Sequence, residues 1–348
     1  MHTYIKVNQY FFNVEISRIK MTYLLLFKLK PFNIVDGESS SQFTPSIIIK
    51  LYRIIRFLRY MHAGVKQQEW PIIQLPLFGH LALYNRRRDS YKVFDVDQNI
   101  VTTLYPPHLT NELIDRLAYY SSIGTAGLGP QYISSNAATN SYEEEYINEP
   151  LLPLQLATSQ HSRAILTEIT SFLHKLKHVF PNTTINRQSY LSDKSTRVPD
   201  ILLLHDGISD KLSFISGAIE HLKGILLADV APIELTLSHG DLHSSNIVRR
   251  NKQLLALDWE FVGWRSSHYD YCFFYYKAFK RMPDMNYGDR QLFYFEYLYH
   301  WFTVLCEDCL HYSLDDIHRT ADWIIKDIEY FHAYEKKNFA ADKPKQKV

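Results

Sequence analysis

The chain has little cysteine, no excess of either charge and no long apolar run. Three cysteines in 348 residues (Cys272, Cys306 and Cys309) argue against a secreted fold built on disulfides and favour a reducing compartment. Lys and Arg number 38 against 37 for Asp and Glu, a net charge of +1, so no strong overall field attracts nucleic acid. No segment approaches the roughly 20 apolar residues of a membrane-spanning helix. We therefore expect a cytoplasmic protein that does not bind nucleic acid.

The hydrophobic pattern changes part-way along the chain and predicts two lobes. The first part is strand-like and contains one helix at 109–120, with short β-type runs at 72–75, 80–85, 91–96, 100–105, 131–133 and 142–147. The second part has helical spacing over 155–178, 208–228, 289–310 and 314–335. An antiparallel sheet followed by helices indicates an α+β fold with two lobes and a cleft between them.

The segment 44–68 predicts a basic amphipathic helix. Thr44 and Pro45 supply an N-cap and a first-turn proline, and apolar and basic residues then fall on opposite faces. Such a helix can lie on an anionic membrane surface, which would give residues 45–62 a peripheral contact with the inner face of the membrane. The alternative is that its apolar face packs against its own domain. The segment 1–43 is left unassigned, and the polar tail 336–348 is expected to be disordered.

The residues that point to a chemistry lie between positions 233 and 260. An apolar run ends in His239-Gly240-Asp241-Leu242-His243, and Asn246 follows Asp241 by five positions. A strand, a turn at 251–252 and a second strand then return the chain, so that Asp258 lies beside Asn246. This spacing fits phosphoryl transfer, in which one carboxylate meets the acceptor hydroxyl while an amide and a second carboxylate hold Mg²⁺ against nucleotide phosphates.

Each residue type in this segment suits one role. Asp241 can orient the hydroxyl and accept its proton, while Asn246 and Asp258 supply the oxygen ligands that Mg²⁺ prefers. His239 would set the loop backbone, and His243 would hydrogen-bond to neighbouring groups of the loop. We therefore take both histidines, with Asp241, as candidate catalytic residues, and a purely structural role for His243 is equally open.

The motif His239-Gly240-Asp241-Leu242-His243-x-x-Asn246, followed by Leu257-Asp258-Trp259-Glu260, resembles the aminoglycoside phosphotransferase and choline kinase superfamily, which is related to protein kinases. The resemblance implies a protein-kinase-like fold, with a nucleotide-binding N-lobe at 69–150 and a catalytic, acceptor-binding C-lobe at 151–335. It implies Mg-ATP as donor, Asp241 as catalytic base, and Asn246 and Asp258 as metal ligands. Asp270 resembles the later aspartate that supports the catalytic loop.

The same resemblance assigns residues to the nucleotide. The segment 142–148 looks like the hinge whose backbone receives adenine, which implies Glu145, Tyr146 and Ile147 as cofactor-binding residues. Glu112, at the start of the predicted helix, resembles the glutamate that pairs with the phosphate-binding lysine.

The phosphate-binding lysine itself is less clearly marked. The strand at 100–105 offers only Thr102 and Thr103, whereas the strand at 91–96 offers Lys92, 20 residues before Glu112. We therefore assign Lys92, and the alternative is an exposed strand lysine.

A glycine-rich phosphate loop is missing from the pattern. Gly79 stands alone and is more typical of a turn than of a phosphate cradle. The run Arg86-Arg87-Arg88 occupies a predicted hairpin turn, where its guanidinium groups could replace the missing backbone donors. The alternative is a solvated turn.

These observations predict an ATP-dependent phosphotransferase that acts on a hydroxyl of a small molecule or glycan, such as a choline-like, sugar or aminoglycoside-like acceptor. The aromatic residues of 264–276 and Trp301 can form a cage for an ammonium group or a stacking platform, or they can belong to the core.

The alternative function is a pseudokinase or nucleotide-binding interaction module without turnover. A protein kinase is disfavoured, because no long activation loop or Ala-Pro-Glu follows Asp258. The oligomeric state is left open.

Overall fold

The structure is a computed structural model, and it describes residues 1–7, 10–24, 71–85, 89–107, 110–149, 151–152, 159–199, 202, 207–308 and 313–341. The chain forms two compact units. Unit 1 consists of Met1–Val179 and Leu242–Glu260, and unit 2 of Phe180–Asp241 and Phe261–Val348. These units do not follow the predicted boundary at residue 150, because 151–179 and 242–260 cluster with the sheet. The predicted basic helix at 44–68 and Arg86-Arg87-Arg88 lie outside the described residues.

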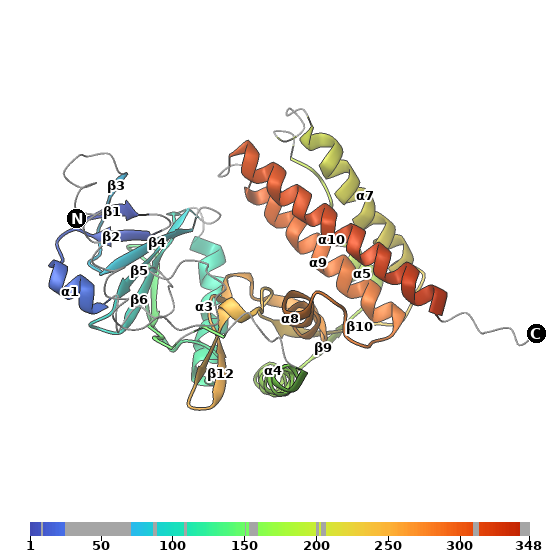
Figure 1. Cartoon of the computed structure of the whole chain (residues 1–348), viewed down its shortest axis with the longest axis horizontal. Coiled ribbons are helices and arrows are strands. Elements are labelled where there is room, and N and C mark those ends of the chain that lie inside the picture. The colour runs from blue at the N-terminus through green and yellow to red at the C-terminus, as the bar shows by residue number, and fades with distance from the viewer. Residues whose placement is uncertain are drawn as a thin grey trace, which may run out of the picture. The chain divides into compact units, whose positions relative to one another are not determined.

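Unit 1 is built on an eight-stranded antiparallel sheet with the order β3-β1-β2-β4-β5-β6-β8-β7 (Figure 1). Its strands are β1 (His2–Val7), β2 (Tyr10–Asn13), β3 (Ile72–Leu75), β4 (Leu81–Asn85), β5 (Ser90–Asp95), β6 (Ile100–Leu104), β7 (Tyr132–Asn136) and β8 (Ser141–Glu145). The six strands predicted from the alternating pattern are therefore confirmed, with shifts of a few residues at their ends.

Both faces of this sheet are packed. Neighbouring residues of one strand belong to different hydrophobic clusters, because successive side chains of a strand point to opposite faces. Ile5 and Phe94 lie in one cluster, and Tyr4 and Val93 lie in the other. The pattern therefore fixes which strand residues share a face with Lys92, a point that matters for the site below.

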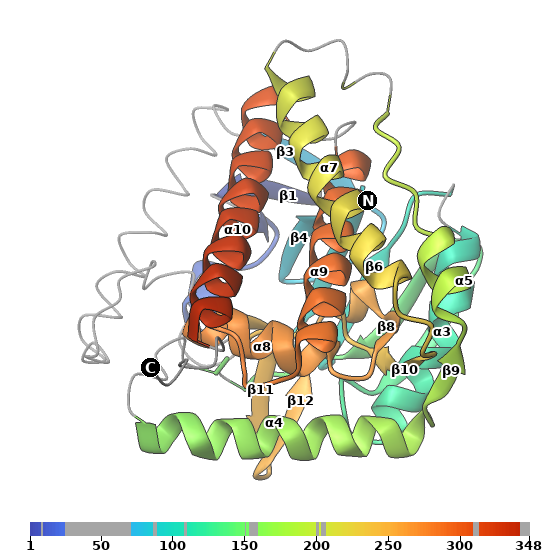
Figure 2. The same cartoon turned by 90° about the vertical axis from the view of Figure 1, so that its right-hand side faces the viewer.

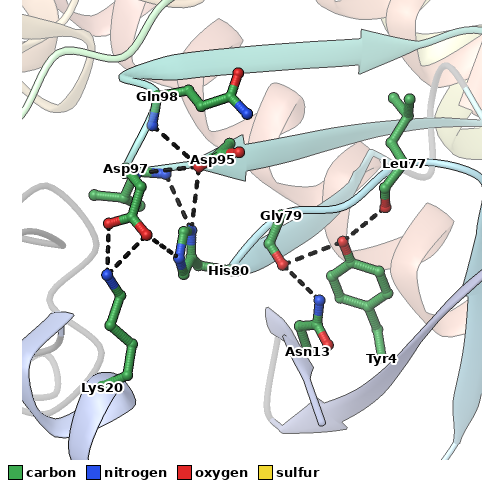
Figure 3. Close-up of polar contacts among 10 residues, drawn as sticks. Tyr4, Asn13, Lys20, Leu77, Gly79, His80, Asp95, Asp97 and Gln98 are labelled. Carbon is green, nitrogen blue, oxygen red and sulfur yellow. Dashed lines mark hydrogen bonds and ion pairs between the residues drawn. The ribbon is translucent and has the colours of Figure 1, made fainter. Parts of the chain in front are cut away.

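The N-terminal strands were not predicted, and polar contacts fasten them to the sheet (Figure 3). The Tyr4 hydroxyl donates to the carbonyl oxygen of Leu77 at 3.0 Å, and Asn13 Nδ2 donates to that of Gly79 at 2.8 Å. Lys20, on helix α1 (Arg18–Tyr23), is 2.6 Å from Asp97 Oδ1. The carbonyl oxygen of Gly79 therefore helps to fasten the N-terminal strands to the sheet.

Two helices and a hairpin complete unit 1. They are α3 (Thr110–Thr125), α4 (Ser159–Val179) and the antiparallel pair β11 (Ile247–Arg250) and β12 (Gln253–Ala256). Asn251 and Lys252 join the two strands with φ values of 50° and 65°, as expected for a two-residue turn that follows the twist of the strands. The predicted hairpin is confirmed.

Unit 2 is mainly helical. Its long helices α7 (Ile208–Leu227), α9 (Tyr287–Asp308) and α10 (Leu314–Ala341) lie side by side (Figures 1 and 2). The shorter elements are α5 (Arg187–Ser192), α8 (Tyr269–Phe279) and an antiparallel sheet in the order β13 (Gly263–Ser266), β10 (Ile233–Ser238) and β9 (Thr183–Ile185). Helix α10 continues six residues into the segment predicted as a polar tail, 336–341, because residues such as Lys336 and Lys337 favour helix.

The predicted α+β class, with an antiparallel sheet followed by helices, is confirmed. Aromatic side chains fill the core of unit 2, and Tyr269, Phe273, Phe274 and Tyr276 of α8 are all buried. Most of the aromatic segment that could have formed an open ligand platform is therefore core. Among the described residues, no helix is both long and apolar enough to span a membrane.

Candidate functional site

A buried carboxylate holds the loop that carries Asp241 through hydrogen bonds. Asp270, at the start of α8, is 4% exposed. It accepts hydrogen bonds from the Ser238 hydroxyl at 2.8 Å, the His239 N–H at 2.7 Å and the Gly240 N–H at 3.1 Å. Hydrogen bonds to an ionised acceptor are among the stronger ones in proteins. Asp270 therefore fixes the end of β10 and the backbone just before Asp241, the role that the resemblance implies for it.

The glycine of this loop cannot be replaced without a clash. Gly240 has a φ of +86°, and a Cβ atom there would collide with the carbonyl oxygen of Phe261 and lie 2.9 Å from the Arg265 guanidinium. Arg265 in turn donates to the Phe261 carbonyl at 3.0 Å. This close approach allows the loop to turn directly after β10 and to present Asp241 at a fixed point of unit 2.

The two candidate histidines act on the loop backbone. His239 is fully buried, and its Nδ1 accepts the N–H of Asp241 at 3.3 Å. His243 caps the short 3₁₀ turn Ser244–Asn246, with its Nδ1 accepting the Ser245 N–H at 3.2 Å. Both rings therefore shape the loop, as the sequence predicts, whereas a direct part in the reaction stays a prediction.

Asn246 and Asp258 are brought together in unit 1 by the hairpin. The Leu257 N–H donates to the Asn246 carbonyl at 2.7 Å, which fixes Asn246 beside the end of β12 and next to Asp258. Asp258 has a φ of 62°, a left-handed conformation that is uncommon for residues other than glycine and concentrates at functional sites.

Lys92 reaches this pair from strand β5. Its Nζ atom is 2.5 Å from Asp258 Oδ1. Burial alone would lower the pKa of Lys92, but the charges of Asp258, Glu144 and Glu260 together raise that pKa above its usual range. The lysine therefore carries its charge at all physiological pH values, as a phosphate-binding cation must.

Three residues around Lys92 were missed at the sequence level. Glu144 pairs with Val101, which pairs with Phe94, so Glu144 points to the same sheet face as Lys92. Burial raises the pKa of Glu144 to about 7, although the Lys92 charge lowers it. Asn85, at the end of β4, donates to Glu260 at 2.6 Å. Glu144 was detectable, because it alternates with two buried tyrosines in 142–146.

Two of the three residues predicted to receive adenine already use their backbone N–H groups in hydrogen bonds within unit 1. The Glu145 N–H donates to the Gln131 carbonyl at 2.8 Å, and the Tyr146 N–H to the Asn99 carbonyl at 2.9 Å. The Glu145 carboxylate is 2.7 Å from Arg250 Nη1. Ile147 is buried against Val248 and Leu255, and Tyr146 is buried in the cluster of Phe94 and Val101. Glu112 lies in the first turn of α3, and its side chain is outside the described residues.

Asn246 and Asp258 have the donor chemistry of a magnesium site that is completed by phosphate. Mg²⁺ is usually held by one or two carboxylates, with waters and substrate phosphates filling the other positions. The described residues contain no cluster of three His, Cys, Asp or Glu side chains that would bind a metal without a nucleotide. One amide and one carboxylate at adjacent points therefore fit a metal that arrives with a nucleotide.

No model of a known protein family matches the chain, and no curated protein matches it in sequence. Solved structures do resemble it. A choline/ethanolamine kinase family protein from Mesorhizobium loti is 15% identical, with a TM-score of 0.44, over 72% of this chain and 87% of that one. A choline kinase from Streptococcus pneumoniae is 12% identical, with a TM-score of 0.47, over 78% and 99%.

An aminoglycoside phosphotransferase from Streptomyces rimosus, solved with ADP and streptomycin, is 14% identical, with a TM-score of 0.37, over 70% of this chain and 89% of that one. These proteins belong to the groups that the motif resembles.

Proposed function

We propose that the protein is an ATP-dependent phosphotransferase that moves the γ-phosphate of Mg-ATP to a hydroxyl group of a small molecule or glycan. The observation that carries the proposal is the contact of 2.5 Å between Lys92 and Asp258. A strand lysine and a carboxylate beside an amide are the groups that hold nucleotide phosphates and their metal in phosphoryl transfer. A merely structural ion pair has no need of the adjacent Asn246.

The residues divide the chemistry between them. Lys92 would bind phosphate oxygens, and Asn246 with Asp258 would hold Mg²⁺, which neutralises charge on the phosphates when it is bound. Asp241 would orient the acceptor hydroxyl and accept its proton as the hydroxyl oxygen attacks phosphorus. Asp270 keeps that carboxylate in place through the backbone of the loop. A fixed Asp241 carboxylate suits this role, because phosphoryl transfer depends mainly on the alignment of the reacting groups and on charge.

The alternative is a nucleotide-binding module without turnover. The retention of Asp241 favours the enzyme, because a scaffold that only binds nucleotide has no use for a proton acceptor at that position. The residues of the site leave the hydroxyl compound open, so the first acceptor panel contains simple sugars as neutral acceptors and choline and ethanolamine as acceptors that carry an ammonium group.

Two measurements on the purified protein test the proposal. We expect Mg-ATP to raise the melting temperature, and γ-labelled ATP with a small-molecule cell extract to yield a labelled small molecule. Label on a small molecule supports the enzyme and identifies its acceptor class. A thermal shift without transfer to any acceptor supports the binding module, and the absence of both results refutes a nucleotide site.

A further inference from the structure

An ammonium group of the protein itself sits in an aromatic cage in unit 2. The Nζ atom of Lys277, on helix α8, lies 4.1 Å from the ring centroid of Trp323, 5.2 Å from Tyr297, 5.3 Å from Phe273 and 5.4 Å from Trp301. The rings come from α8, α9 and α10. Four rings within about 6 Å of one cation form the arrangement by which proteins recognise ammonium ligands.

The cage also contains the polar groups that an ammonium site needs. Lys277 donates to the Tyr297 hydroxyl at 2.9 Å. Behind this hydroxyl lies Asp327, which is 6% exposed and accepts hydrogen bonds from both Tyr297 and Tyr276. Burial lowers the pKa of Lys277 to about 8, and the charges of Asp327 and Asp241 oppose that shift. The cation is therefore held in a partly dry site with a buried counter-charge.

The cage is connected to the loop that carries Asp241. The ring of Trp301 packs against that of Phe261, with 6.4 Å between centroids. The Phe261 carbonyl oxygen lies directly against Gly240, the residue before Asp241. The charge of Asp241 also raises the pKa of Lys277. The cage therefore lies on the side of unit 2 where, on the proposed function, an acceptor meets its base.

We propose that Lys277 is a built-in occupant of an ammonium site and determines acceptor specificity by excluding acceptors that carry a quaternary or primary ammonium group. The exclusion of acceptors rests on the proposed function, whereas the occupied ammonium site does not depend on it. The lysine fills the cage and repels a second cation, so the acceptor is a neutral or anionic hydroxyl compound. An acceptor of the choline class would need the volume and the charge balance that Lys277 already uses.

The test opens the cage and probes it with tetramethylammonium chloride, with sodium chloride at equal concentration as the salt control. Lys277→Ala removes the occupant. Lys194→Ala is the matched control, because among the described residues Lys194 lies over two rings, 4.4 Å from Tyr190 and 5.1 Å from Tyr299. Melting temperature and tryptophan fluorescence are recorded across the titration, since Trp301 and Trp323 line the cage.

We expect tetramethylammonium to raise the melting temperature of Lys277→Ala by at least about 2 °C in a saturable manner. The wild type and Lys194→Ala should bind the probe at least tenfold more weakly. Equal binding by the wild type overturns the proposal, and this arm holds even if Lys277→Ala fails to fold. A folded Lys277→Ala that ignores the probe overturns it as well. Neither binding measurement requires ATP, so its outcome does not depend on whether the protein transfers phosphate.

Discussion

Lys92 on strand β5 and Asp258, 166 residues later, form an ion pair of 2.5 Å that joins the sheet to the end of the β11–β12 hairpin. We expect Lys92→Met to lower label transfer by at least about 100-fold, because a positioned charge on the reacting phosphate is lost. The thermal shift caused by Mg-ATP should disappear as well. The control is Lys20→Met, which removes the more exposed ion pair to Asp97 and should leave both measurements unchanged. Normal nucleotide binding by Lys92→Met would rule out its assignment.

Asp270 should matter for both stability and turnover. Asp270→Ala removes the acceptor of the Ser238 hydroxyl and the His239 N–H, and each buried donor left unsatisfied costs about 1–3 kcal/mol. The Gly240 N–H keeps its second acceptor, the Ser238 hydroxyl oxygen at 3.1 Å. We expect the free energy of unfolding to fall by about 3 kcal/mol or more, as measured by urea denaturation. Asp315→Ala, at an exposed position of α10, is the control. A change below about 1 kcal/mol for Asp270→Ala would show that the loop does not depend on this carboxylate.

Alanine substitutions at two glycines should change the free energy of unfolding in opposite directions. Gly240→Ala places a Cβ against the Phe261 carbonyl oxygen at a φ of +86°, and we expect destabilisation by about 2 kcal/mol or more. Gly217 lies within helix α7, and a Cβ there meets nothing within 4 Å, so Gly217→Ala should stabilise by about 0.5–1 kcal/mol. Thermal denaturation of the two variants separates these outcomes. Similar effects at both positions would contradict the tight turn described for Gly240.

The stability of the protein should fall as pH rises toward neutrality because of Glu144. Its pKa is raised from 4.5 to about 7 in the folded protein, so the folded state binds the Glu144 proton more tightly than the unfolded state. Stability from this group is fully present below about pH 4.5 and is lost as pH rises to about 7, by at most about 3 kcal/mol. Glu144→Gln should flatten this slope in denaturation curves recorded from pH 5 to 8. Glu143→Gln, on the opposite face of β8, controls for the loss of one carboxylate, and an unchanged slope in Glu144→Gln would refute the assignment.

The sequence predicted those parts of the molecule that depend on local pattern. The alternation of β3 to β8, the three long helices of unit 2 and the turn at Asn251 and Lys252 follow from residues close together in the chain. The contact between Asn246 and the end of β12 follows from the same hairpin. Local spacing was sufficient there because the chemistry lies within one short segment.

The rest depended on contacts between distant residues. Strands β1 and β2 pair with β3 and β4, which lie more than 60 residues further along the chain, so their own pattern could not place them. The alternation of Glu144 with Tyr142 and Tyr146 marks it within the run of three glutamates, but only the register with β6 shows that it shares a face with Lys92. The aromatic segment near Trp301 suggested a cage, but its occupant, Lys277, is a residue that the pattern did not single out.

The most direct test of the central claim compares the wild type with Asp241→Asn in a single-turnover assay with γ-labelled ATP and the acceptor found in the screen. We predict a loss of about 100-fold or more in the transfer rate, with the thermal shift caused by Mg-ATP retained, because Asp241 serves the acceptor hydroxyl and Lys92, Asn246 and Asp258 serve the nucleotide. Equal transfer rates for the two proteins would contradict the account.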